Sequence, residues 1–190
     1  ETSDRVESKN FRNFYKGSSL LEIKIDQLLE SQCFDEIYIS SDSLDAQRIC
    51  DERNINFLPR DKAFCNNIIP WPRVIKTVVA SCPEPDDTVI AWCHVTSPLF
   101  HQYAEALSAY EKRKKDEDGL VAVQPCGEFI ISENKIPVNY SWGPWHKYSQ
   151  YLPNYYFING ALFLTTKRIM IDNSYVISSN PLLFPCNKVS

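Results

Sequence analysis

Several short stretches of the sequence combine residue types that could bind a phosphorylated ligand. Lys9 and Asn10 stand in a polar loop before an amphipathic stretch; a lysine there can attract phosphate, and an asparagine can bind a base or sugar. Arg60, the run 94–97 and the pair 159–160 each follow or begin a short apolar stretch. Each of these also has an ordinary structural explanation, as a surface arginine, a helix cap, or a turn or bulge.

Apolar periodicity predicts the elements that must position these residues. Amphipathic patterns indicate helices, and short apolar runs indicate strands. We expect helices over 18–31, 41–54, 70–82 and 96–115, strands over 34–40, 88–95 and 119–126, a short extended piece over 55–59, and a strand followed by a short helix over 156–170. A serine is expected to cap the first helix, and Thr96 or Ser97 the helix over 96–115.

Short apolar strands that alternate with amphipathic helices predict an α/β fold, with a mostly parallel sheet and helices on both faces. The runs 88–95 and 119–126 are almost wholly apolar, which predicts burial on both faces. Ligands of such sheets bind beyond the carboxyl ends of the strands. The residues at those ends are 40–42, 94–97 and 124–125.

Length and composition limit the function classes. The chain has 190 residues and a net charge of −4, which fits one domain and argues against a nucleic-acid-binding surface. Seven cysteines without a C-x-x-C pair indicate a reduced, cytoplasmic protein with no zinc site. The sequence contains neither an apolar run long enough to span a membrane nor an apparent metal-ligand motif.

Motifs along the chain resemble the cytidylyltransferase family that makes CMP-activated sugar acids, of which acylneuraminate cytidylyltransferases are the best known. They are SDRVESKN, KGSSLLEIKI, FDEIYISSDS, LPR, VTSPL, SQYLP and YYFINGALFL. The resemblance implies a Rossmann-like nucleotidyltransferase domain over 1–190, with a dimerisation excursion over about 127–156. It also implies a homodimer and transfer of CMP from CTP to a sugar acid, with Mg²⁺ as cofactor and release of pyrophosphate.

The resemblance also assigns residues to the nucleotide. Ser3, Arg5 and Lys9 fall in the phosphate-binding loop, with Lys9 and Arg5 as the catalytic pair. Asn10 falls where the family contacts the nucleotide, and Arg60 where an arginine holds the cytosine end.

On the acceptor side, the resemblance assigns substrate binding to residues around the corner after the run 88–95 and to the second half of the chain. These are His94, Thr96, Ser97, Gln150 and Asn159.

Departures from the family pattern lie in the phosphate loop and on the acceptor side. Asp4 replaces a basic residue of the phosphate loop, and His94-Val95 replaces a Gln-Pro pair. Ser149 and Phe157 stand where sialic-acid enzymes place arginines for the substrate carboxylate, a strong bidentate contact. We therefore expect a changed acceptor or another clamp, with His146 and Lys147 as nearby substitutes.

The family pattern also contains a strand ending in an Ala-Arg-Gly-Gly-type turn before Ser3, and an Asp-x-Asp metal motif after about Ser190. Neither is in the sequence, so no metal ligands are assigned. Two alternatives remain open beside the enzyme. One is a catalytically impaired relative retained for nucleotide binding or dimerisation, and the other is a cytidylyltransferase for a phosphate or phosphonate acceptor.

Overall fold

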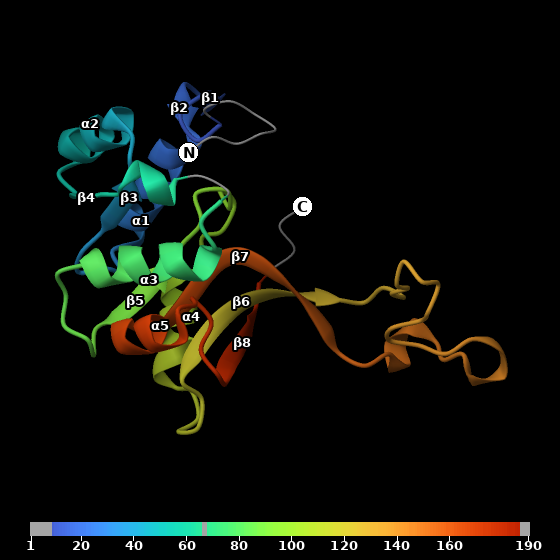
Figure 1. Cartoon of the computed structure of the whole chain (residues 1–190). Helices are drawn as coiled ribbons and strands as arrows, with labels where there is room; N and C mark the ends of the chain where they lie inside the picture. Colours follow the sequence, from blue (N-terminus) through green and yellow to red (C-terminus); the bar gives the residue numbers. More distant parts are fainter. Residues whose placement is uncertain (1–8, 66–67, 187–190) are drawn as a thin grey trace.

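The computed structural model describes residues 9–65 and 68–186, and these form an α/β structure (Figure 1). The elements are β1 (Asn13–Tyr15), β2 (Ser18–Ser19), α1 (Leu20–Ser31), β3 (Tyr38–Ser41), α2 (Leu44–Arg53), β4 (Asn56–Pro59), η1 (Lys62–Phe64), α3 (Trp71–Ser81), β5 (Val89–Trp92), α4 (Tyr103–Glu111), β6 (Gly119–Cys126), η2 (Gly143–Trp145), η3 (Ser149–Tyr151), β7 (Tyr155–Thr166), α5 (Lys167–Asn173) and β8 (Pro181–Pro185). The α/β class expected from the sequence is therefore confirmed.

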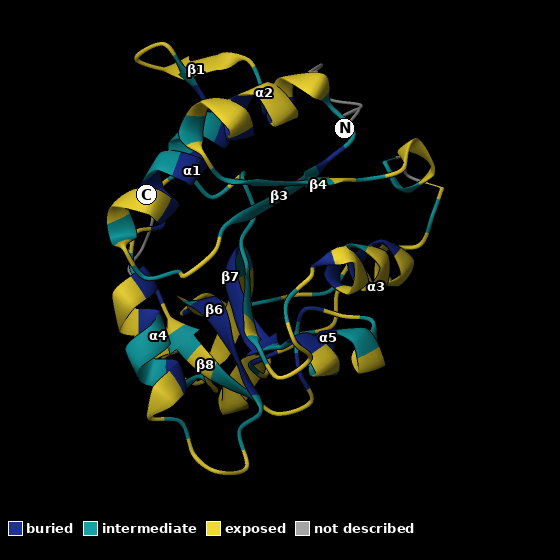
Figure 2. Cartoon of the chain, turned by 90° about the vertical axis from the view of Figure 1, so that its left-hand side faces the viewer, coloured by how far each residue is buried: buried dark blue, intermediate teal, exposed yellow. Residues whose placement is uncertain are grey.

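The strands of the central region form two separate sheets. β3 and β4 are a parallel pair, and β5, β7, β6 and β8 form a four-stranded sheet in that order. Within the larger sheet β5, β6 and β8 run one way, and β7 is antiparallel to both of its neighbours. Among the described strands none hydrogen-bonds to both sheets, and Figure 2 shows the β3–β4 pair apart from the larger sheet.

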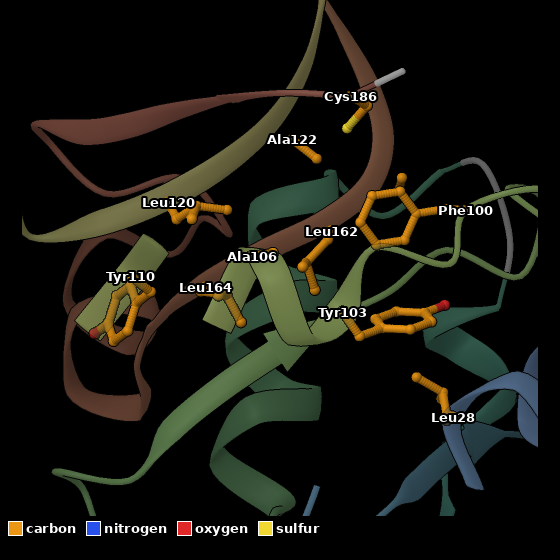
Figure 3. Close-up of a cluster of buried hydrophobic side chains, with 11 residues drawn as sticks. Leu28, Phe100, Tyr103, Ala106, Tyr110, Leu120, Ala122, Leu162, Leu164 and Cys186 are labelled. Atoms are coloured by element: carbon orange, nitrogen blue, oxygen red, sulfur yellow. The ribbon is translucent and has the colours of Figure 1, made fainter. Parts of the chain in front are cut away.

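Helices cover both faces of the larger sheet. Side chains of β6 alternate: Leu120 and Ala122 pack against α4, and Val121 and Val123 pack against α3 and α5. Figure 3 shows the α4 side of this core, where Leu28 of α1 also joins the cluster. The prediction that the run 119–126 is a buried strand is confirmed.

Helix α1 connects the two sheets. Its first half packs on the smaller sheet and α2 through Leu21 and Ile25, and Leu28 one turn later joins the core of the larger sheet. The expected serine cap is confirmed: Ser19 Oγ accepts from Glu22 N at 3.3 Å, and Glu22 Oε2 accepts from Ser19 N at 2.8 Å. This reciprocal capping box fixes where the helix begins. The short β1–β2 hairpin before it was not predicted.

The prediction that the run 88–95 is buried on both faces is wrong. Val89 is exposed and the rest of β5 is half-buried, and β3 is half-buried except for Ser41. β5 is an edge strand of the described sheet, paired on one side with β7. An apolar sequence allows a strand to be buried, but the burial of that strand in the structure depends on which elements pack beside it.

The prediction of a helix over 96–115 is also wrong at its start. α4 begins at Tyr103, and its N-cap residue Gln102 makes no side-chain cap, so neither Thr96 nor Ser97 caps it. Residues 94–100 form two consecutive turns instead, closed by Ser97 N to His94 O at 3.2 Å and Phe100 N to Ser97 O at 3.4 Å. Contacts with α1, described below, hold the carbonyl groups of this segment outside the helix.

Between β6 and β7 the chain leaves the sheet and projects from the body as an arm, residues 127–154 (Figure 1). The arm has a small aromatic nucleus of its own. Phe129 stacks on His146 with ring centroids 5.0 Å apart, and Tyr140 meets both rings edge-on. Asn139 is buried beneath it, accepting from Ile130 N and donating to Glu128 O, both at 2.8 Å.

No helix in the ranges 9–65 and 68–186 combines the length and apolar character needed to cross a membrane. All seven cysteines are free thiols.

Leu162 tests the core of the larger sheet, because its side chain is 0 % exposed. Leu162→Ala should lower the free energy of unfolding by about 2–5 kcal/mol, through lost burial and a residual cavity. Leu44→Ala is the matched control, since Leu44 is 81 % exposed and its truncation should change stability by less than about 0.5 kcal/mol. Urea unfolding measures both, and equal effects would contradict the described core.

Candidate active site

The carboxyl ends of β3 and β4 lie side by side. The two strands pair in parallel from Tyr38 with Asn56 to Ser41 with Pro59, and Arg60 N then donates to Ser41 O at 2.9 Å. Asp42 and Arg60 therefore follow neighbouring strand ends. Ligands of open α/β sheets bind at such ends, so this pair marks one part of the candidate site.

Asp42 and Arg60 both act on the thiol of Cys65, which follows η1. Burial raises the pKa of Cys65; the Arg60 guanidinium opposes this shift, while the Asp42 carboxylate, which accepts a hydrogen bond from the thiol, adds to it. Arg60 Nε is buried and has no hydrogen-bond partner within the described part of the chain. A cation and a carboxylate thus both lie next to Cys65 at this edge, and groups of these two kinds can bind the polar edge of a base.

A buried lysine holds the turn that follows β5. Lys24 of α1 is 1 % exposed, and its Nζ donates to Ser97 O and to Tyr103 Oη, both at 2.8 Å. One turn along the same helix, Gln27 Nε2 donates to Pro98 O. These two bonds take up backbone carbonyls that a helix beginning at residue 96 would direct into its own hydrogen bonds, so α1 sets the shape of the turn.

No carboxylate neutralises Lys24 within the described part of the chain. Two of the three acids of α1, Glu22 and Asp26, are bound to Arg53 of α2, at 3.5 and 2.9 Å, and the third, Glu30, is exposed. Burial lowers the pKa of Lys24 to about 8, and the nearby Cys93 thiol partly opposes the shift. The lysine is therefore a buried cation whose partners are a carbonyl and a phenol, both neutral.

His94 lies in an aromatic group at the end of β5. Its ring centroid is 5.7 Å from that of Phe163 on β7 and 6.5 Å from that of Trp71 at the start of α3. Trp71 also meets Trp92 edge-on at 6.1 Å and remains 46 % exposed. Aromatic rings at a sheet edge can stack on a base or on the apolar face of a sugar.

Gly160 makes room for the His94 ring. Its φ is +71°, a region that side chains rarely adopt, and a Cβ there would lie 2.9 Å from His94 Nδ1. The pairing of β6 with β7 shifts between Val121 and Val123, so Asn159-Gly160 belong to a bulge. Asn159 Oδ1 accepts from Ala161 N at 3.0 Å, which stabilises this bulge.

The structure brings together some of the assigned residues. Arg60 lies beside Asp42, while His94 and Ser97 share one turn, with Gly160 against His94. Asn10 is buried near the start of α1, where its backbone carbonyl oxygen accepts a hydrogen bond from Leu21 N at 3.1 Å.

Other assigned residues are not gathered there. Gln150 is exposed in η3 of the arm and has no described contact with His94 or Asn159. Lys9 is half-buried and Thr96 exposed, and Ser3 and Arg5 lie outside the described residues.

Lys24 was missed from the sequence, although a signal exists. With Leu21, Ile25 and Leu28 it occupies spacing i, i+3, i+4 and i+7, so a lysine lies on the apolar face of α1. A charged residue in that position is rarely buried without a specific role.

The described residues do not fit a dedicated magnesium site. Within 9–65 and 68–186 no group of three or more His, Cys, Asp or Glu side chains could hold a metal ion. Mg²⁺ prefers carboxylate ligands together with substrate phosphates, so no step below is assigned to the ion.

Comparison with known proteins gives a family model and structures of similar fold. A family model described as Cytidylyltransferase matches residues 2–152. A search of curated proteins gave no significant match.

Solved structures of low sequence identity share the fold. A CMP:2-keto-3-deoxy-manno-octonic acid synthetase in complex with CTP has a TM-score of 0.64 and 10 % identity, covering 91 % of this chain and 73 % of that one. A 4-diphosphocytidyl-2C-methyl-D-erythritol synthase from Anaerococcus prevotii has 0.61 and 13 %, covering 86 % and 69 %. Another synthase of that name has 0.64 and 10 %, covering 95 % and 86 %. These similarities show the Rossmann-like nucleotidyltransferase fold.

The buried Lys24 should make stability rise with pH in an alkaline window. Its pKa is about 8 in the folded chain against an ordinary value of 10.5. The unfolded chain therefore binds more protons between these values, and the free energy of unfolding increases across them by up to about 3 kcal/mol. Below about pH 8 the full penalty for the charged lysine is present.

Urea unfolding of the natural chain and of Lys24→Met from pH 7 to pH 10 measures this effect. The difference between the two curves removes the titration of tyrosines, cysteines and exposed lysines. It should change with pH by about 1–3 kcal/mol. Parallel curves would show that Lys24 does not titrate in this window.

Proposed function

Because the chain belongs to the cytidylyltransferase family, we propose that it transfers CMP from CTP to the hydroxyl group of a sugar-acid acceptor. The acceptor oxygen bonds to the α-phosphorus, the bond from that phosphorus to the pyrophosphate oxygen breaks, and the hydroxyl proton is lost. Pyrophosphate leaves. The protein's part in such a transfer is mainly to position the reactants and to offset developing charge.

The observation that carries this proposal is the arrangement at the strand ends. Arg60 and Asp42 follow β4 and β3, and the turn that contains His94 and Ser97 follows β5. The family model spans all four residues. In the proposed site Arg60 and Asp42 bind the cytosine end, while His94 and the residues of its turn lie on the acceptor side.

The acceptor class is a proposal that rests on side chains as well as on family. Ser149 and Phe157 carry no charge where the sialic-acid pattern has arginines, and Phe157 is 53 % exposed on β7. Such a site lacks the bidentate clamp for that carboxylate. The solved 2-keto-3-deoxy-manno-octonic acid synthetase takes a different sugar acid on this fold. We favour a sugar acid other than N-acetylneuraminate, with Mg²⁺ as cofactor, in the reducing cytoplasm that seven free thiols suit.

Pyrophosphate release from CTP and Mg²⁺ tests this function with a panel of acceptors. The panel contains N-acetylneuraminate, 2-keto-3-deoxy-manno-octonic acid and 2C-methyl-D-erythritol 4-phosphate. We expect release with the second acid, little with N-acetylneuraminate, and a loss of about tenfold or more in kcat/KM for CTP in Arg60→Ala. Lys62→Ala is the control, because Lys62 is an exposed cation two residues away.

Each other outcome is informative. Fast turnover of N-acetylneuraminate would contradict the altered acceptor. Release only with the phosphorylated acceptor would favour the phosphate-acceptor alternative. CTP binding without release from any acceptor would favour a nucleotide-binding relative over an enzyme.

We also propose that the arm joins two copies of the chain. It projects from the body, and its exposed aromatic side chains form a surface that a monomer would leave in water (Figure 1). They include Trp142, Trp145, Tyr148 and Tyr151. Aromatic residues are the usual anchors of protein interfaces.

Light scattering over a concentration series tests the dimer. The natural chain should be dimeric, and Trp145→Ser with Tyr148→Ser, each 75 % exposed in the natural chain, should weaken the dimer at least about tenfold. Tyr175→Ser on the body is the control and should leave the dimer intact. A monomeric natural chain, or an unaffected double variant, would contradict the proposal.

A further inference from the structure

Lys24 is a cation immediately beneath the proposed acceptor corner. Its Nζ lies 2.8 Å from the carbonyl oxygen of Ser97, and the next residue back, Thr96, is exposed. The buried charge therefore contacts the backbone of a turn whose neighbouring residue reaches the surface after β5. Two of the three ammonium donors are used, by Ser97 O and Tyr103 Oη.

The groups that face this ammonium from each packed element are uncharged. Tyr103 comes from α4 and Cys93 from the end of β5, and burial raises the pKa of both. Of the three carboxylates of α1, Glu22 and Asp26 are engaged by Arg53, and Glu30 is exposed. The positive charge is thus uncompensated by the described residues, although burying a charge without a counter-ion is costly.

We propose that Lys24 is a positioning residue of the active site that holds the Ser97 turn in place and attracts an anionic group of the substrate to the end of β5. This inference rests on the proposed function and adds a residue that the family resemblance does not assign. The anionic group is a phosphate of CTP or the carboxylate of the acceptor. Either would supply the counter-charge missing from the described chain, and a partly buried cation interacts with it more strongly than an exposed one.

Proton uptake on binding follows from this charge pairing. A bound anion favours the charged form of Lys24, so its pKa must rise when the ligand binds. Since that pKa is about 8 in the free chain, the lysine is partly neutral at pH 8.5 and takes up a proton on binding. Phosphate groups are already ionised at this pH, because their second pKa is about 6.

Isothermal titration calorimetry in two buffers of different ionisation enthalpy measures this uptake. The ligands are CTP, uncharged cytidine and 2-keto-3-deoxy-manno-octonic acid. Each is titrated at about pH 7.0, where Lys24 is charged, and at about pH 8.5, where it is partly neutral. For the anion that Lys24 attracts we expect uptake on the order of half a proton at the higher pH and less than about a tenth at the lower. Cytidine should show none, and the two anions separate phosphate from carboxylate as the source.

Lys24→Met should abolish the uptake and weaken binding of that anion about tenfold. Lys76→Met, an exposed lysine of α3, is the control and should change neither. Unaltered uptake in Lys24→Met, or binding by the natural chain without uptake, overturns the inference. If Lys24→Met does not fold, the natural chain's own uptake at the two pH values still decides. Absence of any CTP binding is a different result and contradicts the proposed function itself.

Discussion

The hydrogen bonds from Lys24 and Gln27 to the carbonyl groups of Ser97 and Pro98 are the interactions on which the described site depends. Apart from the β1–β2 hairpin, the described strands form two sheets that share no hydrogen bonds, so the relative position of these two sheets is set by side-chain packing and by α1. Leu21 and Ile25 fix one half of that helix to the smaller sheet, and Leu28 fixes the other half to the larger one. Lys24 lies between Leu21 and Leu28 on this helix, and its hydrogen bond to Ser97 connects α1 to the turn after β5.

This arrangement explains why a costly buried cation is present. An apolar residue at position 24 would pack in α1 without leaving a charge in the core, but it would leave the carbonyl of Ser97 without its donor. The charged lysine therefore lowers the free energy of unfolding at neutral pH, while its hydrogen bond fixes the conformation of the turn. Functional sites are where such local conflicts between sequence and stability are expected.

Periodicity predicted the helices and strands well where local signals agree with packing, as in α1 with its Ser19 cap and in β6 with its alternating core. Periodicity failed where contacts with distant parts of the chain determine the conformation or burial of a segment. The segment 96–102 has good capping residues, yet Lys24 and Gln27 from far away in the chain hold it as turns. β5 has the composition of a buried strand but pairs on one side only. At the site, the position of residues 40–42 and 94–97 at strand ends was predicted, whereas the pairing of β3 with β4 that brings Arg60 near Asp42 was not. The contact of His94 with Gly160 depends on a bulge that no periodicity reveals.

The central claim is that the ends of β3, β4 and β5 together form the active site, in which CTP extends from its cytosine at β3 and β4 to its reacting α-phosphate beside the acceptor turn after β5. Hydrogen–deuterium exchange of the whole chain with and without CTP tests it most directly. The account predicts slower exchange over residues 40–43, 59–65 and 94–98, and unchanged exchange over the arm residues 130–150. CTP-dependent protection confined to the arm, or protection at one sheet without the other, would contradict it.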